Sequence, residues 1–537
     1  MIKRLFCIVL LLACAAVAQV SPQPPQVYID TTWNPPTGGV TWSAHTSTDL
    51  KNALNGAQPG DVIVLDAGAT YTGNFTLAAK SNPSEKWIYI VSSALNNLPA
   101  PGTMVTPSNA VEMPKIVTPN SSNAFTVASG AGYVRFVGIE MYSTSTYLAN
   151  PTHQPWPVNG FSYYLLLSQG GTHVTVDRCY LHGSPTQDVN HAVGAAAGSS
   201  YFAMVDSYVS DIHGGTNDSQ AFGAWASPGP FKLVDNFLSA TTEDVLFGGA
   251  GGYSNAVQPA DIEIRNNHFW KDPAWQAMTS GPTPWQWFVK NNLECKSCQR
   301  MVVTGNLFEN VWHGSDQLGE NIILTPRTNQ SGYTAVDDDI DIENNTLKNA
   351  NEGFTIGGYD NNCTAPACTI QGETKRIVIK NNLILTRDPA EVSSYQPLGF
   401  QIGKQIDGLL IQHNTVKGIN GTQSWGSIYF PMSGQTAHPA SSNVYIFDNV
   451  LPHQVTGDGG YQGQMALDTY MPLPGPDGNR FFGNVMFVPA SEKLNSTWPV
   501  HNYATTVPLT FDGTDQLLTP LWSDTTDGAV AGYHPAQ

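Results

Sequence analysis

Hydrophobic and polar residues repeat along the chain in one short pattern, apolar-x-apolar-x-x-Asn-x-apolar. Clear copies occupy residues 262–269, 340–347 and 377–384. Alternation with period two predicts a β-strand, and a repeat every roughly 20–50 residues is typical of solenoids and propellers. The pattern therefore predicts an array of β-structure rather than a single compact core.

The sixth position of the pattern marks successive copies, and 345 residues over ten steps give a mean spacing of 34.5. Asn tolerates a left-handed backbone at a bend, and its amide can bond the same amide one coil away. Such a ladder needs like turns about 4.8 Å apart. We therefore predict an all-β, single-stranded parallel β-helix of about eleven coils. The marker residues are Ile139, Cys179, Ser207, Asn236, Asn267, Asn306, Asn345, Asn382, Asn414, Asn449 and Asn484.

A second apolar strand follows the marker in most coils, at residues 245–247, 322–324, 354–356, 400–402 and 428–430. The coils are longer than the strands require, so each carries additional loop. We expect these loops to form walls beside a strand face, where function usually resides.

The two ends of the repeat resemble caps. Leu50, Ala53, Leu54 and Ala57 have helical spacing, and residues 46–49 offer capping side chains. A helix there would cover the exposed edge of the first coil. Beyond about residue 487 the repeat is lost, which predicts an irregular C-terminal cap.

The N-terminus resembles an export signal, with a basic start, an apolar stretch at residues 5–16 and Ala16-Val17-Ala18 before the expected cleavage point. A lipoprotein anchored through Cys14 is the alternative. We expect a secreted, extracellular or periplasmic protein. The predicted segments are a signal peptide (1–18), a linker (19–45), an N-terminal cap with the first coils (46–130), the β-helix (131–490) and a C-terminal cap (491–537).

Composition narrows the choice of partners. Only 12% of the 537 residues are charged, and the formal net charge is −18. An acidic chain argues against nucleic acid, because phosphate binding needs a basic face. It also repels a polyuronate unless a basic patch or a bound cation intervenes. No later segment is long and apolar enough to predict a membrane span, and the oligomeric state stays open.

The cysteines outside the signal have structural interpretations. Cys179 occupies a marker position, which predicts a core residue. Cys295 and Cys298 form one Cys-x-x-Cys without a second pair, so we interpret them as a disulfide or two thiols rather than a zinc site. Cys363 and Cys368 could form a local disulfide in an oxidising compartment.

Several segments resemble known β-helix proteins. Residues 49–54 (DLKNAL), 59–65 (PGDVIVL) and Gly68-x-x-Tyr71-x-Gly73 are similar to the beginning of pectate-lyase-like proteins. Residues 243–249 and 261–267 resemble a group of secreted bacterial β-helix proteins. The similarity covers about residues 45–490 and implies right-handed coils and, often, polysaccharide lyase or hydrolase activity. The polygalacturonase signatures are absent, and the calcium ligands and Arg base of pectate lyases have no matching residues here.

Basic and aromatic residues gather between residues 265 and 327. Flat aromatic faces suit sugar rings, and basic groups suit a uronate carboxylate. These side chains are candidates for substrate binding, although tryptophans on a long loop also clamp it to the coils. The candidates are Trp270, Trp275, Trp285, Trp287, Trp312, Lys271 and Arg300.

Acidic residues recur just before the second strand, at Glu243, Asp244, Glu320 and Glu352. Carboxylates one coil apart would be about 4.8 Å apart, near the separation in retaining glycosidases. Glu294 adds a carboxylate near the tryptophans. Glu243 and Asp244 are also candidate ligands of Ca²⁺, a cation that prefers oxygen.

The sequence thus predicts a secreted protein that acts on an extracellular polysaccharide. A lyase acting on a uronate-containing glycan by β-elimination would need a base and a group that neutralises the carboxylate. Lys290 or His313 could be the base, with Arg327 or Arg300 as the neutralising group. A glycoside hydrolase using Glu243 or Glu294, or a non-catalytic glycan-binding protein, are the alternatives. No organic cofactor is expected.

Overall fold

The structure is a computed structural model. It describes residues 20–147, 160–215, 217–249, 257–276, 287, 289–312, 317–327, 335–359, 373–387, 397–418, 426–431, 440–452, 455–458, 461–471, 480–487, 501–519 and 525–535. The predicted signal peptide, His313, Trp285 and the pair Cys363 and Cys368 lie outside the described residues.

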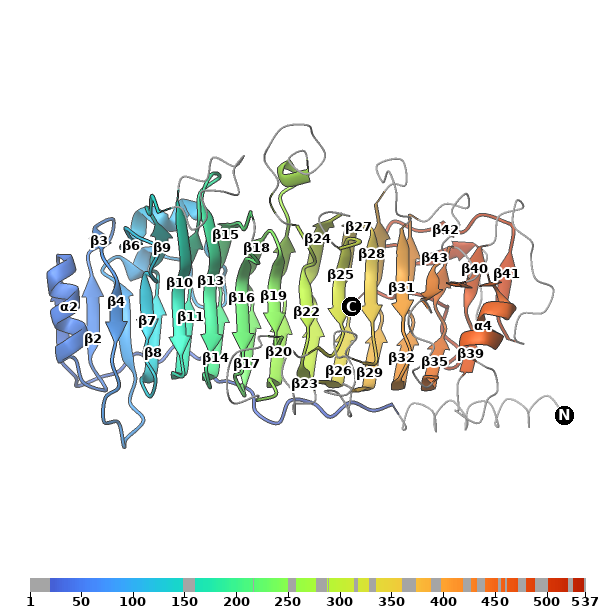
Figure 1. Ribbon diagram of the computed structural model, residues 1–537, viewed down its shortest axis with the longest axis horizontal. Helices are drawn as coiled ribbons and strands as arrows, with labels where there is room; N and C mark the ends of the chain where they lie inside the picture. Colours follow the sequence, from blue (N-terminus) through green and yellow to red (C-terminus); the bar gives the residue numbers. More distant parts are fainter. Residues whose placement is uncertain are drawn as a thin grey trace. The chain divides into compact units, whose positions relative to one another are not determined.

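The fold is a right-handed parallel β-helix, as predicted, and the chain divides into two compact units. The first unit along the chain is Pro25–Leu293, and the second combines Glu294–Gln537 with Met1–Pro24. In both, each coil contributes one strand to each of three parallel sheets, which we name sheets A, B and C in the order in which the chain visits them (Figure 1). Among the described residues, no helix has the length and hydropathy required to cross a membrane.

In Pro25–Leu293, apolar side chains of the three sheets point inward and form the core. Sheet A is β1 (Thr41–Ala44), β2 (Val62–Leu65), β5 (Ile88–Ser92), β8 (Gly132–Val137), β11 (Thr172–Asp177), β14 (Ser200–Val205), β17 (Phe231–Val234) and β20 (Ala260–Arg265). Sheet B is β3 (Thr70–Thr72), β6 (Lys115–Thr118), β9 (Glu140–Ser143), β12 (Tyr180–His182), β15 (Tyr208–Ile212), β18 (Phe237–Ala240) and β21 (His268–Trp270). Sheet C is β4 (Phe75–Leu77), β7 (Phe125–Val127), β10 (Phe161–Gln169), β13 (Asp188–Ala196), β16 (Gln220–Trp225) and β19 (Glu243–Phe247).

The strand β22 (Leu293–Cys295) spans the boundary between the units, and the same order of sheets continues in Glu294–Gln537. Sheet A is β23 (Cys298–Thr304), β26 (Val336–Glu343), β29 (Glu373–Lys380), β32 (Ile406–Gln412), β35 (Ser442–Phe447) and β39 (Arg480–Phe482). Sheet B is β24 (Leu307–Val311), β27 (Thr346–Ala350), β30 (Leu383–Thr386), β33 (Thr415–Lys417), β36 (Val450–Leu451), β40 (Val485–Phe487) and β41 (Tyr503–Thr505). Sheet C is β25 (Glu320–Leu324), β28 (Glu352–Ile356), β31 (Leu398–Ile402), β34 (Ile428–Phe430), β37 (Val455–Gly457) and the antiparallel β38 (Tyr461–Gln462).

The corner between sheets A and B carries the predicted amide ladder. In the second unit, the Asn345 carbonyl oxygen Oδ1 accepts from the backbone N (2.9 Å) and Nδ2 (3.0 Å) of Asn306, and the same pair of bonds recurs through successive coils to Asn502. In the first unit, Ser207 donates to Asn236, and Asn236 donates to Asn267. Cys179 is buried at its ladder position, as predicted.

The left-handed residue at this corner is not the marker itself but the residue before it. Asn266, Asn344, Asn381 and His413 have φ between 53° and 60°. The marker side chains point inward and are fully or almost fully buried. The bend therefore separates the two roles: one residue takes the strained backbone, and the next satisfies buried polar groups.

The predicted N-terminal cap is the helix α2 (Ser47–Gly56). Thr46 and Asp49 form a capping box, and Leu50, Ala53 and Leu54 are buried. The segment before it, predicted as a linker, includes strand β1, which pairs with β2.

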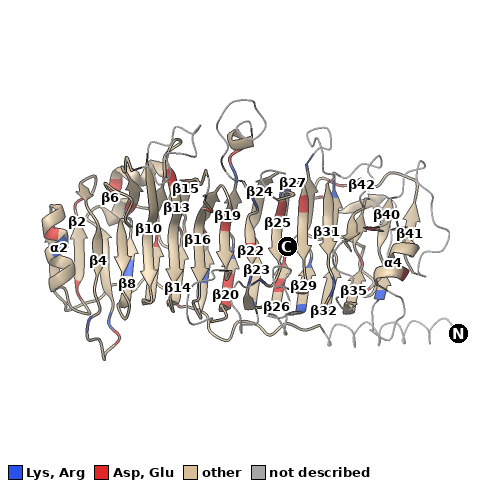
Figure 2. Ribbon diagram, viewed as in Figure 1, with Lys and Arg blue, Asp and Glu red and all other residues tan. Residues whose placement is uncertain are grey.

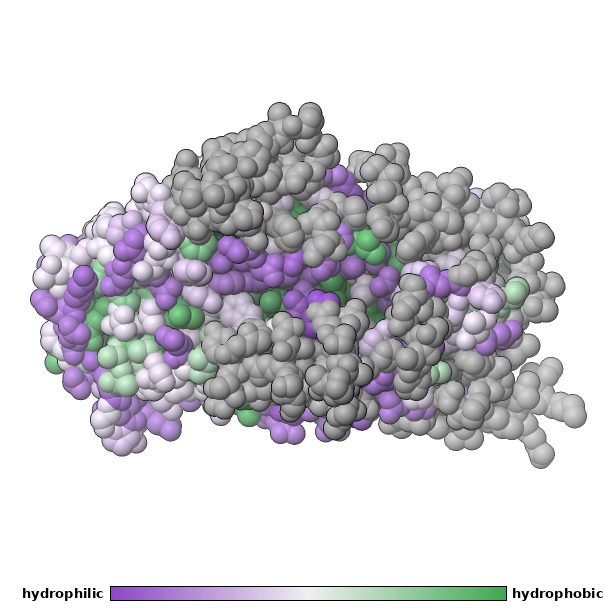
Figure 3. All heavy atoms as spheres, in the orientation of Figure 1, coloured by the Kyte–Doolittle hydropathy of each residue, from purple (hydrophilic) through white to green (hydrophobic). Residues whose placement is uncertain are grey.

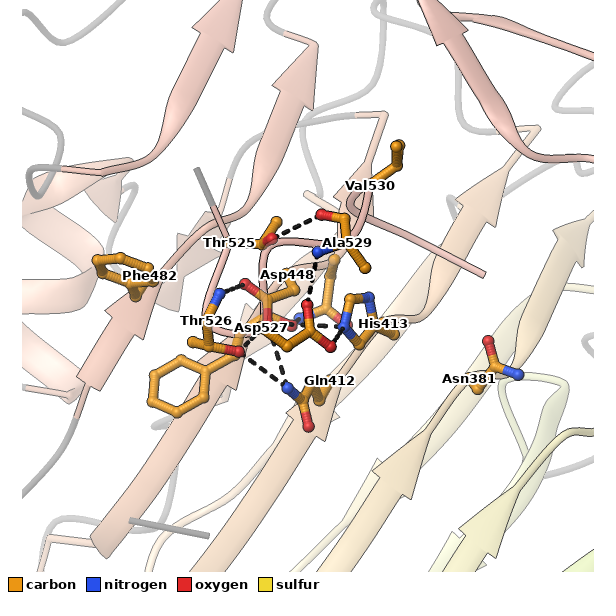
Figure 4. A network of polar contacts seen from close by, with 12 residues as sticks. Asn381, Gln412, His413, Asp448, Phe482, Thr525, Thr526, Asp527, Ala529 and Val530 are labelled. Carbon is orange, nitrogen blue, oxygen red and sulfur yellow. Dashed lines mark hydrogen bonds and ion pairs between the residues drawn. The ribbon is translucent and has the colours of Figure 1, made fainter. Parts of the chain in front are cut away.

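The end of the chain combines several small elements. The helix α4 (Gln464–Tyr470) follows β38, and β42 (Thr510–Phe511) pairs with β43 (Leu517–Thr519). Residues 525–535 run along the corner of sheets A and B, where Thr526 donates to Asp448 and Asp527 accepts from His413 at 2.9 Å (Figure 4). We name this segment the C-terminal strap.

We predict that Asn414→Ala lowers the free energy of unfolding by about 1–3 kcal/mol, because it removes the acceptor of the buried backbone N of Asn382, whose Nδ2 keeps the carbonyl oxygens of Ile342 and Lys380. Urea denaturation followed by circular dichroism measures the change. Asn52→Ala, on the exposed face of α2, is the control and should change stability by less than about 0.5 kcal/mol. A small effect at Asn414 would contradict the ladder's role.

Candidate functional site

The acidic residues that recur before the second strand lie at the first position of sheet C strands in the second unit. Glu320 begins β25, Glu352 begins β28, and the two are register partners in adjacent coils (Figure 2). A Cβ built on Gly353 would lie 3.1 Å from Ile384 in the core, so Gly353 faces inward. Because neighbouring residues in a strand face opposite sides, Glu352 faces outward.

A cavity of about 320 Å³ lies on this outer side of sheet C, within the second unit. Ile322 and Leu324 are fully buried in the core, and Ile323 between them lines the cavity. Figure 3 shows both hydrophilic and hydrophobic described residues at the surface near the middle of the view. The lining includes the carboxylates Glu294 and Glu320, the cation Arg327, and the hydroxyl or amide groups of Thr325, Thr355, Tyr359 and Gln401.

The environment of Glu320 favours its protonated form. Burial raises the pKa of Glu320 to about 7; backbone N–H groups including that of Leu318 lower it, and the charge of Glu294 raises it. Burial and then the neighbouring Glu320 raise the pKa of Glu352 well above its ordinary value. Burial is the main cause of both shifts, and a neighbouring carboxylate adds to each: Glu294 for Glu320, and Glu320 for Glu352.

Glu294 has a different environment at the same cavity. Its Oε1 lies 3.4 Å from Lys296 Nζ, and both side chains are largely buried. An ammonium at this distance pairs with an ionised carboxylate. The cavity therefore brings together a carboxyl group that holds its proton and one that is paired with a cation.

Of the predicted catalytic residues, the structure brings Lys290 and Glu243 together in the first unit. Lys290 Nζ lies 2.8 Å from Asp218 Oδ1 and 3.6 Å from Glu243 Oε1. Glu243 also accepts from Gln220 Nε2 at 2.5 Å. An ammonium between two carboxylates has no lone pair with which to accept a substrate proton, so this arrangement does not support Lys290 as a base.

Lys271 does not lie where a glycan could reach it. Its side chain is fully buried, and Nζ donates to the carbonyl oxygens of Ala240 and Thr242, each at 2.9 Å, and lies 3.3 Å from Asp244 Oδ1. The prediction that Lys271 binds substrate is therefore wrong in this structure. A buried ammonium needs such acceptors, and here it joins sheets B and C.

The expected calcium ligands Glu243 and Asp244 do not form a common site. They are adjacent in β19 and so face opposite sides of the strand. Glu243 lies beside Lys290, and Asp244 beside Lys271. Burial raises the pKa of Asp244 to about 7, and Lys271 lowers it. A cation beside each carboxylate does not fit a calcium site at this pair.

The candidate tryptophans mostly serve packing. Trp275, Trp287 and Trp312 are 3–5% exposed. Trp287 stacks on His213 at 4.4 Å, and Trp275 meets the same ring edge-on at 5.2 Å. Burial between these rings lowers the pKa of His213 to about 4. Trp270 is partly exposed and stays a candidate for substrate binding.

Of the two candidate arginines, Arg327 and Arg300, one lies at the cavity and the other does not. Arg327 lines the cavity, as a neutralising group would need to. Arg300 lies on β23 in sheet A, donates to Gln299 at 3.0 Å and does not line the cavity. His313 and Trp285 lie outside the described residues.

Comparison with known proteins does not identify the reaction that this chain catalyses, if any; only its own residues bear on that question. No family model matches the chain, and no curated protein matches it. Similar solved structures include the alginate lyase from Paenibacillus sp. str. FPU-7 (12% identity, 68% of this chain, 99% of that chain, TM-score 0.36), the polygalacturonase from Erwinia carotovora ssp. carotovora (11%, 81%, 96%, 0.43) and the pectate lyase Pel9A (14%, 84%, 80%, 0.37). The assignment of the fold rests on the strand pairing described above.

We predict that Glu320→Gln stabilises the protein at pH 8 and has little effect at pH 4. The folded pKa of about 7 lies above the ordinary 4.5, so the unfolded chain releases this proton first as pH rises. Stability therefore falls between pH 4.5 and 7 by an amount on the order of 3 kcal/mol, which the amide avoids. Thermal denaturation at several pH values measures the difference; an equal effect at both pH values would contradict the raised pKa.

Proposed function

We propose that this protein is a glycoside hydrolase that cleaves an extracellular polysaccharide, with Glu320 as the general acid and Glu294 as the ionised carboxylate. The observation that carries the proposal is the pairing of these two groups at one cavity, one with a pKa of about 7 and the other beside Lys296. Carboxyl groups whose environments differ in this way can divide the acid and base roles of glycosidic bond cleavage.

The proposed chemistry follows from these environments. The Glu320 carboxyl, still protonated near neutral pH, would donate its proton to the leaving glycosidic oxygen. The Glu294 carboxylate would either attack the anomeric carbon or activate a water, depending on its distance from Glu320 in the bound complex. Glu352 adds a second carboxyl beside Glu320 and helps to hold the proton on that pair.

The other cavity residues suit a sugar. Thr325, Thr355 and Gln401 offer hydroxyl and amide groups for sugar hydroxyls, and Tyr359 adds an aromatic ring. Ligand sites of this kind combine a partly apolar wall with a few convergent polar groups. The expected export of the chain would bring this site to extracellular glycans.

A lyase acting on a uronate-containing glycan is the second candidate, favoured by one observation. Arg327 lines the same cavity and could neutralise a uronate carboxylate. The described lining residues, however, include no neutral histidine or lysine that could serve as the base. For the lyase, a requirement for Ca²⁺ is a further proposal. Glu243 and Asp244 do not form the site for that ion.

We predict that Glu320→Gln lowers kcat by roughly 10²–10⁴-fold, because the amide cannot protonate the leaving group. Wild-type kcat should fall as pH rises through about 7, where Glu320 loses its proton. The assay follows new reducing ends on a panel of polysaccharides, with absorbance of unsaturated uronates as a second channel. Glu343→Gln, a partly exposed carboxylate on sheet A, is the matched control and should leave kcat unchanged.

The two channels separate the candidates. Reducing ends without absorbance support the hydrolase. Absorbance of unsaturated uronates that disappears in Arg327→Gln would contradict the hydrolase and support the lyase. Binding to a polysaccharide in an affinity gel without either signal would replace both by a non-catalytic glycan-binding protein.

A further inference from the structure

The disulfide between Cys295 and Cys298 closes the turn that leads out of the candidate site. Only Lys296 and Ser297 separate β22 from β23, so the chain passes from sheet C to sheet A within two residues. In the next coil, the same passage takes residues 325–335. The Cα atoms of the two cysteines are 5.7 Å apart, a separation that an unstrained disulfide spans.

The outer side of this turn carries part of the cavity. Glu294 immediately precedes Cys295, and Lys296, which pairs with Glu294, follows it. The backbone of the turn also holds the next coil, because Cys295 O accepts from Thr325 N at 3.0 Å and Lys296 O accepts from Arg327 N at 2.9 Å. Both Thr325 and Arg327 line the cavity. The turn thus fixes the backbone positions of three polar lining residues, Glu294, Thr325 and Arg327.

The inner side of the turn contacts buried residues of sheet A, Met301 and Asp337. Both cysteines are fully buried, and Cys295 Sγ lies 3.7 Å from Met301 Sδ. Cys298 N donates to Asp337 Oδ1 at 3.0 Å, and Asp337 is also fully buried. An oxygen of Asp337 lies within 4.8 Å of both sulfur atoms. Burial raises the pKa of Asp337 well above its ordinary value.

The size of the closed loop indicates what this disulfide does. A disulfide stabilises the folded state more when it closes a longer loop of the unfolded chain. This one joins residues three positions apart and constrains little of the unfolded chain. Its effect is therefore concentrated on the geometry of the turn and of the residues attached to it.

We propose that the Cys295–Cys298 disulfide is a positioning element of the acidic cavity, which holds Glu294, Lys296 and Arg327 in the arrangement that catalysis requires. The inference rests on the proposed function, because it names what keeps that site in place. Without the bond, the two-residue turn can relax, and the Glu294–Lys296 pair and the backbone bonds to Thr325 and Arg327 loosen with it. The cysteines themselves touch no substrate.

The test replaces both cysteines in the full chain, as C295S/C298S. Misplacement of a catalytic group by about 1 Å costs up to roughly a hundredfold in rate, so kcat should fall about ten- to a hundredfold with KM changed less than about threefold. The fall of kcat near pH 7 should shift, because the charge of Glu294, which raises the pKa of Glu320, moves relative to it. The melting temperature should change by only a few degrees, because the closed loop is short.

Cys179→Ser is the matched control. Cys179 is the buried free cysteine of the first unit, and Ser207 fills the same ladder position one coil later. This variant should keep kcat, the pH profile and the melting temperature. If C295S/C298S fails to fold, C295A/C298A, with apolar side chains in the buried positions, provides the same comparison.

The outcomes separate this inference from the proposed function. If the cysteine variant keeps the wild-type kcat and pH profile while Glu320→Gln is inactive, the positioning role is overturned. The proposed hydrolase function then still stands. If no glycan is hydrolysed, infrared titration of the Glu320 carboxyl, identified by its absence in Glu320→Gln, decides instead. A pKa of about 7 that shifts when the disulfide is removed supports the positioning role, and an unchanged pKa overturns it.

Discussion

The rest of the structure depends on the amide ladder at the corner of sheets A and B. At each coil the backbone must turn within two residues while its polar groups stay away from water. A buried amide donates forward to the next coil and back to carbonyls of its own and the preceding coil; Asn414, for example, donates to Asn449, Ile379 and Gln412. Because a buried polar group without a partner is costly, each coil depends on its neighbour. In the second unit the ladder thereby helps to set the register in which the sheet C side chains are placed.

That register explains how carboxylates distant in sequence meet. Glu320 and Glu352 are 32 residues apart, and they become neighbours because both occupy the first position of a sheet C strand. Loops of different length between the coils do not disturb this pairing. The same regularity buries Glu320, and burial is the main cause of its raised pKa, with a smaller contribution from the charge of Glu294. A repetitive core can thus bring carboxylates that are distant in sequence together without any local sequence motif.

The sequence predicted the features that depend on periodicity. The coils, the second strand, the capping helix and the buried Cys179 all follow from spacing or from a repeated position. It also showed that acidic residues recur at Glu243, Glu320 and Glu352, but not which of them border a cavity. The errors concern side-chain burial. Lys271 resembled a surface cation because lysine is rarely buried, and only the carbonyl groups of Ala240 and Thr242 reveal its partners. Trp275 and Trp287 were ambiguous for a similar reason, since a long loop says nothing about which way its rings point.

The C-terminal strap has a consequence for the order in which the second unit forms. Ladder bonds there join residues 18–39 positions apart, whereas the strap joins Thr526 to Asp448 across 78 positions, Gln412 to Thr526 across 114 and His534 to Asn381 across 153. Contacts between distant residues are slow to form because long segments must first be ordered. The parallel pairing of neighbouring coils can therefore form before the strap docks on them. Docking of the strap then completes the burial of Asp448, and burial raises the pKa of its carboxyl group.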